Sequence, residues 1–213
     1  MQSSSTPLSI EDFEKLHKEG AFIIDSRPTP EVKKGFILGS HPIPIGPNFT
    51  KWIDGIVKNK DTPIIVVANP GQEEESVSTI KSLGYTDVRG YLEGGFDAWK
   101  KAGKHVHERK GISVPDFVEK LDKGAKVLDV RTKEEHEQGI LENAQMIHFM
   151  EITERWSEVP KDQPVYVHCK LGARALLAYA VLQSKGHENV VDIEGGIGDI
   201  EAAGAKLKPP TSK

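Results

Sequence analysis

The chain of 213 residues repeats itself, and this repeat restricts the fold more than any other feature of the sequence. Nine residues between positions 9 and 35 recur at a fixed offset of 104, and three later residues recur at an offset of 101. The first set pairs Ser9 with Ser113, Asp12 with Asp116, Phe13 with Phe117, Gly20 with Gly124, Ala21 with Ala125, Asp25 with Asp129, Arg27 with Arg131, Glu31 with Glu135 and Gly35 with Gly139; the second pairs Pro63 with Pro164, Gly95 with Gly196 and Gly103 with Gly204. A period this long predicts two duplicated domains rather than the stacked units of a solenoid.

Each repeat has the pattern of alternating helices and strands. Ser9 and Ser113 are expected helix N-caps, with Asp three positions later where a capping box has Glu. Apolar or β-branched runs without a helical period predict buried parallel strands at 21–25, 64–68, 126–130, 165–168 and 190–193. A helix is expected over 173–184, ending at Gly186. The alternation predicts an α/β fold with a parallel sheet in each domain.

The charged, His-containing stretch at 104–110 marks the boundary between the repeats. We expect a linker at 1–7, a first domain at 8–104, a linker at 105–111, a second domain at 112–207 and a tail at 208–213.

Composition excludes several classes of protein. The net charge of −4 argues against a nucleic-acid binder with a broad basic face. No apolar run approaches the roughly 20 residues of a membrane helix, and the N-terminus lacks the basic and apolar regions of a signal peptide. The single cysteine favours a reducing, cytoplasmic setting. His105 and His107 are the only close histidine pair and are expected at the surface, so we expect no metal and no cofactor.

The segment around Cys169 has the pattern of a chemical site. A strand leads to Cys169, Gly172 favours a tight turn, and a helix follows. Backbone N–H groups in such a turn, together with the positive end of the helix dipole, stabilise a thiolate. The predicted substrate-binding loop comprises Lys170, Leu171, Gly172, Ala173 and Arg174. A buried, inert Cys169 is the alternative. His168 is read as structural, because adjacent strand residues point to opposite faces.

These residues resemble tandem rhodanese domains over nearly the whole chain. The motifs are Asp129-Val-Arg131, Glu135, the loop Cys169–Arg174, Gly186–Val190 and Glu194–Gly196, with Asp25-Ser-Arg27, Gly84–Val88 and Glu93–Trp99 in the first repeat. The resemblance implies two parallel sheets, each with helices on both faces. It also implies a sulfurtransferase whose Cys169 takes sulfur from thiosulfate, glutathione persulfide or a similar donor as a persulfide, and passes it to a thiol or cyanide.

The resemblance further suggests roles for individual side chains. Asp129 and Arg131 are expected to be structural, beneath the loop. Lys170 and Arg174 are expected to steer the anionic donor, although Arg174 bracing the loop is an equal alternative. Cysteine phosphatases resemble this loop but have five residues between Cys and Arg instead of four, which disfavours a phosphatase.

The first repeat has Ala68 at the cysteine position, and its loop continues Asn69-Pro-Gly-Gln-Glu-Glu-Glu75. We therefore expect this domain to be inactive, with its glutamates repelling thiosulfate. The stretches Gly39–Ile45, Phe49–Trp52 and Pro63–Ala68 resemble persulfide dioxygenases of the metallo-β-lactamase fold that are fused to rhodanese domains. This resemblance implies a metal-binding domain before this chain. The chain would then be a non-catalytic accessory module of a larger enzyme, which is the alternative to a sulfurtransferase.

Overall fold

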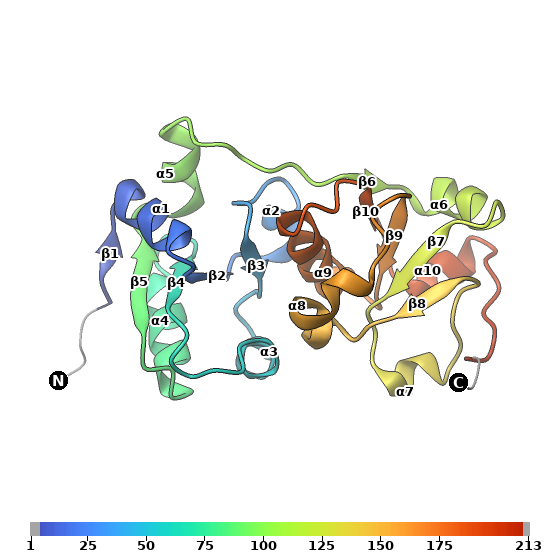
Figure 1. Ribbon diagram of the computed structural model, residues 1–213, viewed down its shortest axis with the longest axis horizontal. Coiled ribbons are helices and arrows are strands. Elements are labelled where there is room, and N and C mark those ends of the chain that lie inside the picture. The colour runs from blue at the N-terminus through green and yellow to red at the C-terminus, as the bar shows by residue number, and fades with distance from the viewer. Residues whose placement is uncertain (1–4, 211–213) are drawn as a thin grey trace. The chain divides into compact units, whose positions relative to one another are not determined.

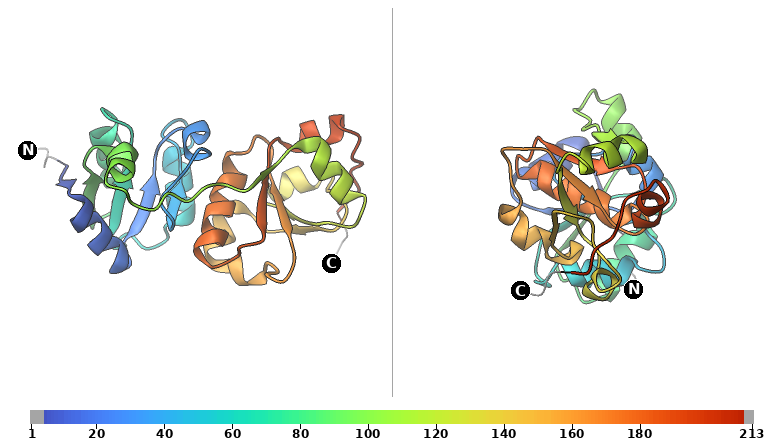
Figure 2. Two further views of the ribbon diagram at one scale, coloured as in Figure 1. Left: turned by 90° about the horizontal axis from the view of Figure 1, so that it is seen from above. Right: turned by 90° about the vertical axis from the view of Figure 1, so that its right-hand side faces the viewer.

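The computed structural model describes residues 5–210 and divides the chain into two compact units, 1–108 and 109–213 (Figures 1 and 2). The first unit comprises β1 (Pro7–Leu8), α1 (Ile10–Lys18), β2 (Phe22–Asp25), α2 (Thr29–Val32), β3 (Ser40–Pro42), α3 (Phe49–Ile56), β4 (Ile64–Val67), α4 (Glu73–Ser82), β5 (Val88–Leu92) and α5 (Gly95–Lys101). The second comprises β6 (Gly111–Ile112), α6 (Val114–Leu121), β7 (Lys126–Asp129), α7 (Lys133–His136), β8 (Ala144–Met146), η1 (Phe149–Glu151), α8 (Ile152–Arg155), η2 (Trp156–Glu158), β9 (Val165–His168), α9 (Ala173–Ser184), β10 (Val190–Ile193) and α10 (Ile197–Ala202).

Each unit contains a parallel five-stranded sheet, and the two sheets have the same topology. The strand order is β1-β5-β4-β2-β3 in the first unit and β6-β10-β9-β7-β8 in the second. The registers also correspond, since Asp25 lies opposite Val67 and Asp129 lies opposite His168. The predicted duplication and the predicted α/β class are therefore confirmed.

The cores follow from the alternation of side chains along the central strands. In the first unit, Ile65 and Val67 of β4 pack with Phe13 of α1 and Trp99 of α5 on one face of the sheet. In the second unit, Tyr166 of β9 packs in the same way with residues of α6 and α10. Helices α4 and α9 contact the central strands of their own units. Within residues 5–210, no helix is both long and apolar enough to cross a membrane.

Local capping sets where the first helix of each unit begins. The hydroxyl oxygens of Ser9 and Ser113 accept hydrogen bonds from the N–H groups of Asp12 and Asp116, at 3.1 and 3.3 Å. Each Asp carboxylate accepts a hydrogen bond from the serine hydroxyl. In a full capping box the acidic side chain would instead accept from the backbone N–H of the N-cap residue, so the reciprocal half of the motif is not formed here.

Segments that the sequence assigned to linkers also take part in the sheets. Strand β1 begins at Pro7, and β6 occupies Gly111 and Ile112. Two antiparallel bridges add to this: Phe36 pairs with His107, and Ile140 pairs with Lys208. These contacts tie the ends of each unit to its own fold. Residues 1–4 and 211–213 of the expected linker and tail lie outside the described part.

Candidate functional site

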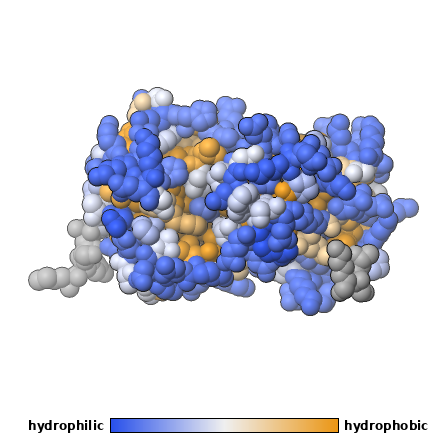
Figure 3. Space-filling model, viewed as in Figure 1, coloured by the Kyte–Doolittle hydropathy of each residue, from blue (hydrophilic) through white to orange (hydrophobic). Residues whose placement is uncertain are grey.

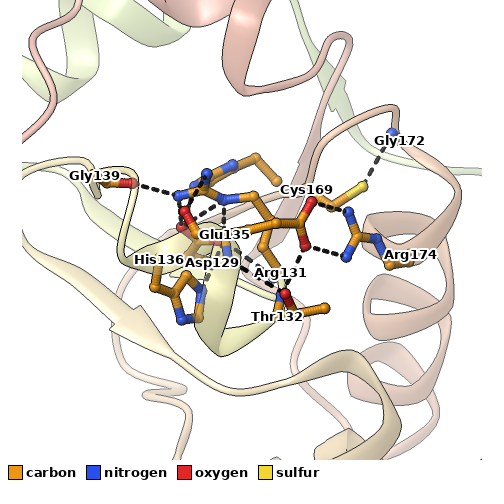
Figure 4. A network of polar contacts seen from close by, with 10 residues as sticks. Asp129, Arg131, Thr132, Glu135, His136, Gly139, Cys169, Gly172 and Arg174 are labelled. Atoms are coloured by element: carbon orange, nitrogen blue, oxygen red, sulfur yellow. Dashed lines mark hydrogen bonds and ion pairs between the residues drawn. The ribbon is translucent and has the colours of Figure 1, made fainter. Parts of the chain in front are cut away.

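Strand β9 delivers Cys169 to the carboxyl edge of the second sheet, where the chain turns into α9. The N–H of Gly172 donates a hydrogen bond to the Cys169 Sγ at 3.0 Å (Figure 4). Gly172 has a φ of 95°, in the left-handed region that favours glycine, and this conformation aims its N–H at the sulfur. Cys169 is 1% exposed, and its carbonyl oxygen accepts from the N–H of Ile197. The loop therefore holds the sulfur against a backbone donor at the start of a helix.

Arg174 extends from the first turn of α9 to Glu135 of α7. Its two terminal nitrogens donate to the two Glu135 oxygens at 2.6 and 2.8 Å. Glu135 also accepts from the N–H of Thr132, whose hydroxyl caps α7 in return. Arg174, with help from the Thr132 N–H, lowers the pKa of Glu135 to about 2. Of the two roles considered for Arg174, this geometry is that of a brace between the loop and α7.

A second ion pair lies at the end of β7. The Asp129 carboxylate accepts from Arg131 at 2.7 Å, and Arg131 also donates to the carbonyl oxygen of Gly139. Both side chains are buried. Burial alone would raise the pKa of Asp129, but His136, His168 and Arg131 together lower it below its ordinary value. The pair joins the end of the strand to the turn that follows α7 (Figure 4).

The remaining predicted loop residues are the most accessible part of the site. Lys170 is exposed and Leu171 is 87% exposed, whereas Ala173 is the first residue of α9. Leu38 is the only other exposed large hydrophobic side chain in the described part of the chain, and the face drawn in Figure 3 is largely hydrophilic. The loop thus presents a leucine and a lysine outward and its sulfur inward.

Sequence reasoning missed two features of this site. The first is the Glu135–Arg174 pair, although Glu135 belongs to the repeated residues and Thr132-x-x-Glu135 has the capping-box pattern. The second is a group of histidines around Asp129. The Nε2 atoms of His136 and His168 lie 3.3 and 3.5 Å from its carboxylate oxygens. Burial lowers the pKa of His168, which is fully buried and packs beneath the loop.

The equivalent edge of the first unit has the same Asp–Arg ion pair but a different loop. Asp25 and Arg27 form the matching buried pair at 2.6 Å. Gly71, the counterpart of Gly172, also has a positive φ, of 88°, but its N–H donates to the Glu73 carboxylate at 2.6 Å. Asn69 binds Glu31 at 2.9 Å. In the first unit, the Glu73 carboxylate therefore occupies the Gly71 N–H, whereas the equivalent Gly172 N–H of the second unit faces the Cys169 sulfur.

A pocket of about 200 Å³ lies beside Ala68 in the first unit. Its lining has charges of both signs, from Arg27, Lys34, Glu31 and Asp97 among others. Neither unit contains, within residues 5–210, a cluster of three or more His, Cys, Asp or Glu side chains arranged to hold a metal ion.

Comparison with known proteins agrees with this architecture. The model of the rhodanese-like domain family matches residues 9–102 and again residues 113–203. The chain therefore belongs to the rhodanese-like domain family, with two copies of the domain.

The curated relatives match this chain over a stretch about as long as one of its two domains. A sulfurtransferase of Allochromatium vinosum is 38% identical over 71 residues, which is 33% of this chain and 66% of the relative. The uncharacterized protein YqhL of Bacillus subtilis is 30% identical over 84 residues, which is 39% of this chain and 64% of the relative. The chain thus spans just under two thirds of the length of either relative. A solved rhodanese-related protein from Thermoplasma volcanium is 31% identical with a TM-score of 0.43, covering 46% of this chain and 97% of its own.

Gly196 tests how tightly the loop is packed. A Cβ at this position would overlap the carbonyl oxygen of Lys170, whereas a Cβ at Gly198, in α10, would meet nothing within 4 Å. We predict that Gly196→Ala lowers the free energy of unfolding by roughly 1–3 kcal/mol, because the loop backbone must shift. Urea unfolding measures this loss. Gly198→Ala is the matched control and should be neutral or slightly stabilising. Equal effects of the two changes would contradict the packing argument.

The Glu135–Arg174 pair predicts a specific dependence of stability on pH. Because folding lowers the pKa of Glu135 from 4.5 to about 2, the pair stabilises the fold fully above pH 4.5 and progressively less as the pH falls toward 2. Urea unfolding of wild type and Glu135→Gln should therefore differ most near neutral pH and converge on acidification. In an Arg174→Gln background the same change should show much less pH dependence. A wild-type-to-variant difference that stays constant with pH would refute the assignment.

Proposed function

We propose that the second unit is a sulfurtransferase that moves sulfane sulfur from thiosulfate or a persulfide to a thiol or cyanide through a persulfide on Cys169. The observation that carries the proposal is the Gly172 N–H, 3.0 Å from the Cys169 Sγ at the start of a helix. Such a donor stabilises a negatively charged sulfur, both before and after loading. The name of the Allochromatium vinosum relative, a sulfurtransferase, supports the same class of reaction.

The reaction has two displacements. The Cys169 thiolate attacks the outer sulfur of thiosulfate, the new S–S bond forms, the old one breaks, and sulfite leaves with its electron pair. The terminal sulfur of the Cys169 persulfide is then attacked by an acceptor thiolate or cyanide, and the Cys169 thiolate is regenerated. Since Arg174 is engaged by Glu135, the proposal gives it the role of holding the loop, and leaves attraction of the anionic donor to Lys170.

The role of the first unit follows from its loop. With Ala68 at the cysteine position and Glu73 on the Gly71 N–H, we propose that this unit is inactive in transfer. An accessory role for the whole chain is the second candidate. The preceding metallo-β-lactamase-fold domain and the cytoplasmic setting remain predictions based on the sequence alone.

Removal of Cys169 tests the proposed function directly. Wild type incubated with thiosulfate and cyanide should form thiocyanate, and its intact mass should increase by one sulfur atom. Cys169→Ala should lose both signals, because the chain then has no sulfur nucleophile. Thiocyanate formation by the variant, or no loading of wild type, would reject the proposal. Hydrolysis of an aryl phosphate that depends on Cys169 would instead favour a phosphatase.

Restoring a cysteine in the first unit tests why that unit is inactive. We predict that Ala68→Cys, made in the Cys169→Ala background, does not load sulfur from thiosulfate, because Glu73 already holds the Gly71 N–H and Pro70 has no N–H to offer. Adding Glu73→Gln should speed alkylation of the new thiol by iodoacetamide. Loading of Ala68→Cys alone at the wild-type rate would show that the nucleophile is the only missing part.

A further inference from the structure

Histidines distinguish the unit that has the cysteine from the unit that lacks it. Matching hydrogen bonds align the ends of β3 and β8: Ile43 N–H donates to the Asp25 carbonyl at 2.9 Å, and Ile147 N–H donates to the Asp129 carbonyl at 3.2 Å. With this alignment and the strand registers, His136, His148 and His168 correspond to Val32, Pro44 and Val67. All three ionisable rings at this edge of the second sheet are therefore replaced by apolar residues in the first.

Burial separates the three histidines. His136 is 7% exposed and His168 is fully buried, and both rings are directed at Asp129. A substrate cannot touch them without displacing the core. His148 is only partly buried, two residues beyond the end of β8. Of the three, it is the one that a bound substrate can reach.

His148 belongs to the same group of side chains as the loop. Its ring meets the Phe149 ring edge-on at 4.7 Å, and the Arg174 guanidinium lies 5.8 Å from the centre of the same Phe149 ring. Glu135, which pairs with Arg174, and Cys169 both raise the pKa of Arg174. The Phe149 ring therefore joins His148 to the cation that braces the transfer loop.

The charges that face His148 come from three neighbouring elements. They are Glu134, Glu135 and His136 of α7, Glu151 of η1 and Arg174 of α9. Burial lowers the pKa of His148, Glu151 and Glu135 oppose this, and Arg174 and His136 add to it. A lowered pKa makes the His148 imidazolium a stronger acid than that of a free histidine, so it gives up its proton more readily in the pH range where it is present, as a general acid requires.

We propose, on the basis of the sulfurtransferase function above, that His148 donates the proton to the thiol that leaves when a persulfide is the sulfur donor. The Cys169 thiolate attacks the outer sulfur of R–S–SH, a new S–S bond forms between Cys169 and that sulfur, and the S–S bond of the donor breaks. The electron pair stays on R–S, which takes the proton of the His148 imidazolium and departs as R–SH. Solvent returns the proton to the neutral imidazole.

This role assigns a substrate class. An alkyl thiolate is strongly basic, with a conjugate thiol of pKa about 8.5, so its departure gains from a proton donor. Sulfite is less basic than an alkyl thiolate and gains less from a proton donor. His148 therefore makes the site suited to persulfides of alkyl thiols in preference to thiosulfate.

The leaving group provides the test. Wild type, His148→Gln and His148→Leu would each be loaded with sulfur in single turnovers. Three donors would be compared: glutathione persulfide, thiosulfate, and the persulfide of an acidic aryl thiol. Intact mass would follow the sulfur added to Cys169. We expect loading from glutathione persulfide to slow roughly 10²-fold. Loading from thiosulfate should change little, and the aryl donor should restore most of the lost rate. The advantage of wild type should also fall as the pH rises, because the imidazolium is lost.

The outcomes separate this inference from the function on which it depends. Undiminished thiosulfate loading shows that the variants are folded and that Cys169 is reactive. Equal slowing with all three donors, or no slowing with glutathione persulfide, would overturn the role of His148 while leaving the sulfurtransferase intact. Failure of wild type to load from any donor would reject the sulfurtransferase itself.

Discussion

The buried Asp–Arg ion pair is the interaction on which both sites are built. In each unit the arginine reaches a carbonyl oxygen eight residues further on, at Gly35 or Gly139, so one side chain fixes the strand end and the turn beyond the next helix. A buried ion pair is expensive to desolvate unless its geometry and its other hydrogen bonds are good, and here they are. The pair is complete in the unit that has no cysteine. It therefore belongs to the frame of the fold rather than to the chemistry.

The two units differ in the titratable residues that surround this ion pair. Burial raises the pKa of Asp25, and Arg27 only partly opposes the rise. Asp129 is as deeply buried, yet its pKa is lowered, because His136 and His168 add to the effect of the arginine. The same carboxylate is thus held more firmly in its charged form in the unit with the cysteine. The histidines that replace apolar residues contribute to this difference on the Asp129 side, and the charge of Glu31 contributes on the Asp25 side.

The sequence predicted the elements that carry a local signal and missed those that depend on contacts between elements. Strands β9 and β10 and helix α9 were placed to the residue, since apolar runs and glycines mark their ends. The edge strands β1 and β6 are two residues long, too short to show a pattern. The Glu135–Arg174 pair joins positions 39 residues apart, and its partners meet only because α7 and α9 face the same edge of the sheet. Capping explains why Glu135 lies near Thr132, but no local rule selects Arg174.

The two loops together show what the turn does apart from the nucleophile. Gly71 and Gly172 occupy equivalent positions, both have a positive φ, and each donates its N–H to an electron-rich atom within its own loop. In one loop that atom is the sulfur of Cys169; in the other it is a carboxylate oxygen of Glu73, which stands where the second unit has Arg174. The turn thus presents a backbone donor to an electron-rich atom in both units. On the proposed function, the first unit is therefore inactive for two reasons: it lacks the nucleophile, and the backbone donor that would serve a thiolate already binds the Glu73 carboxylate.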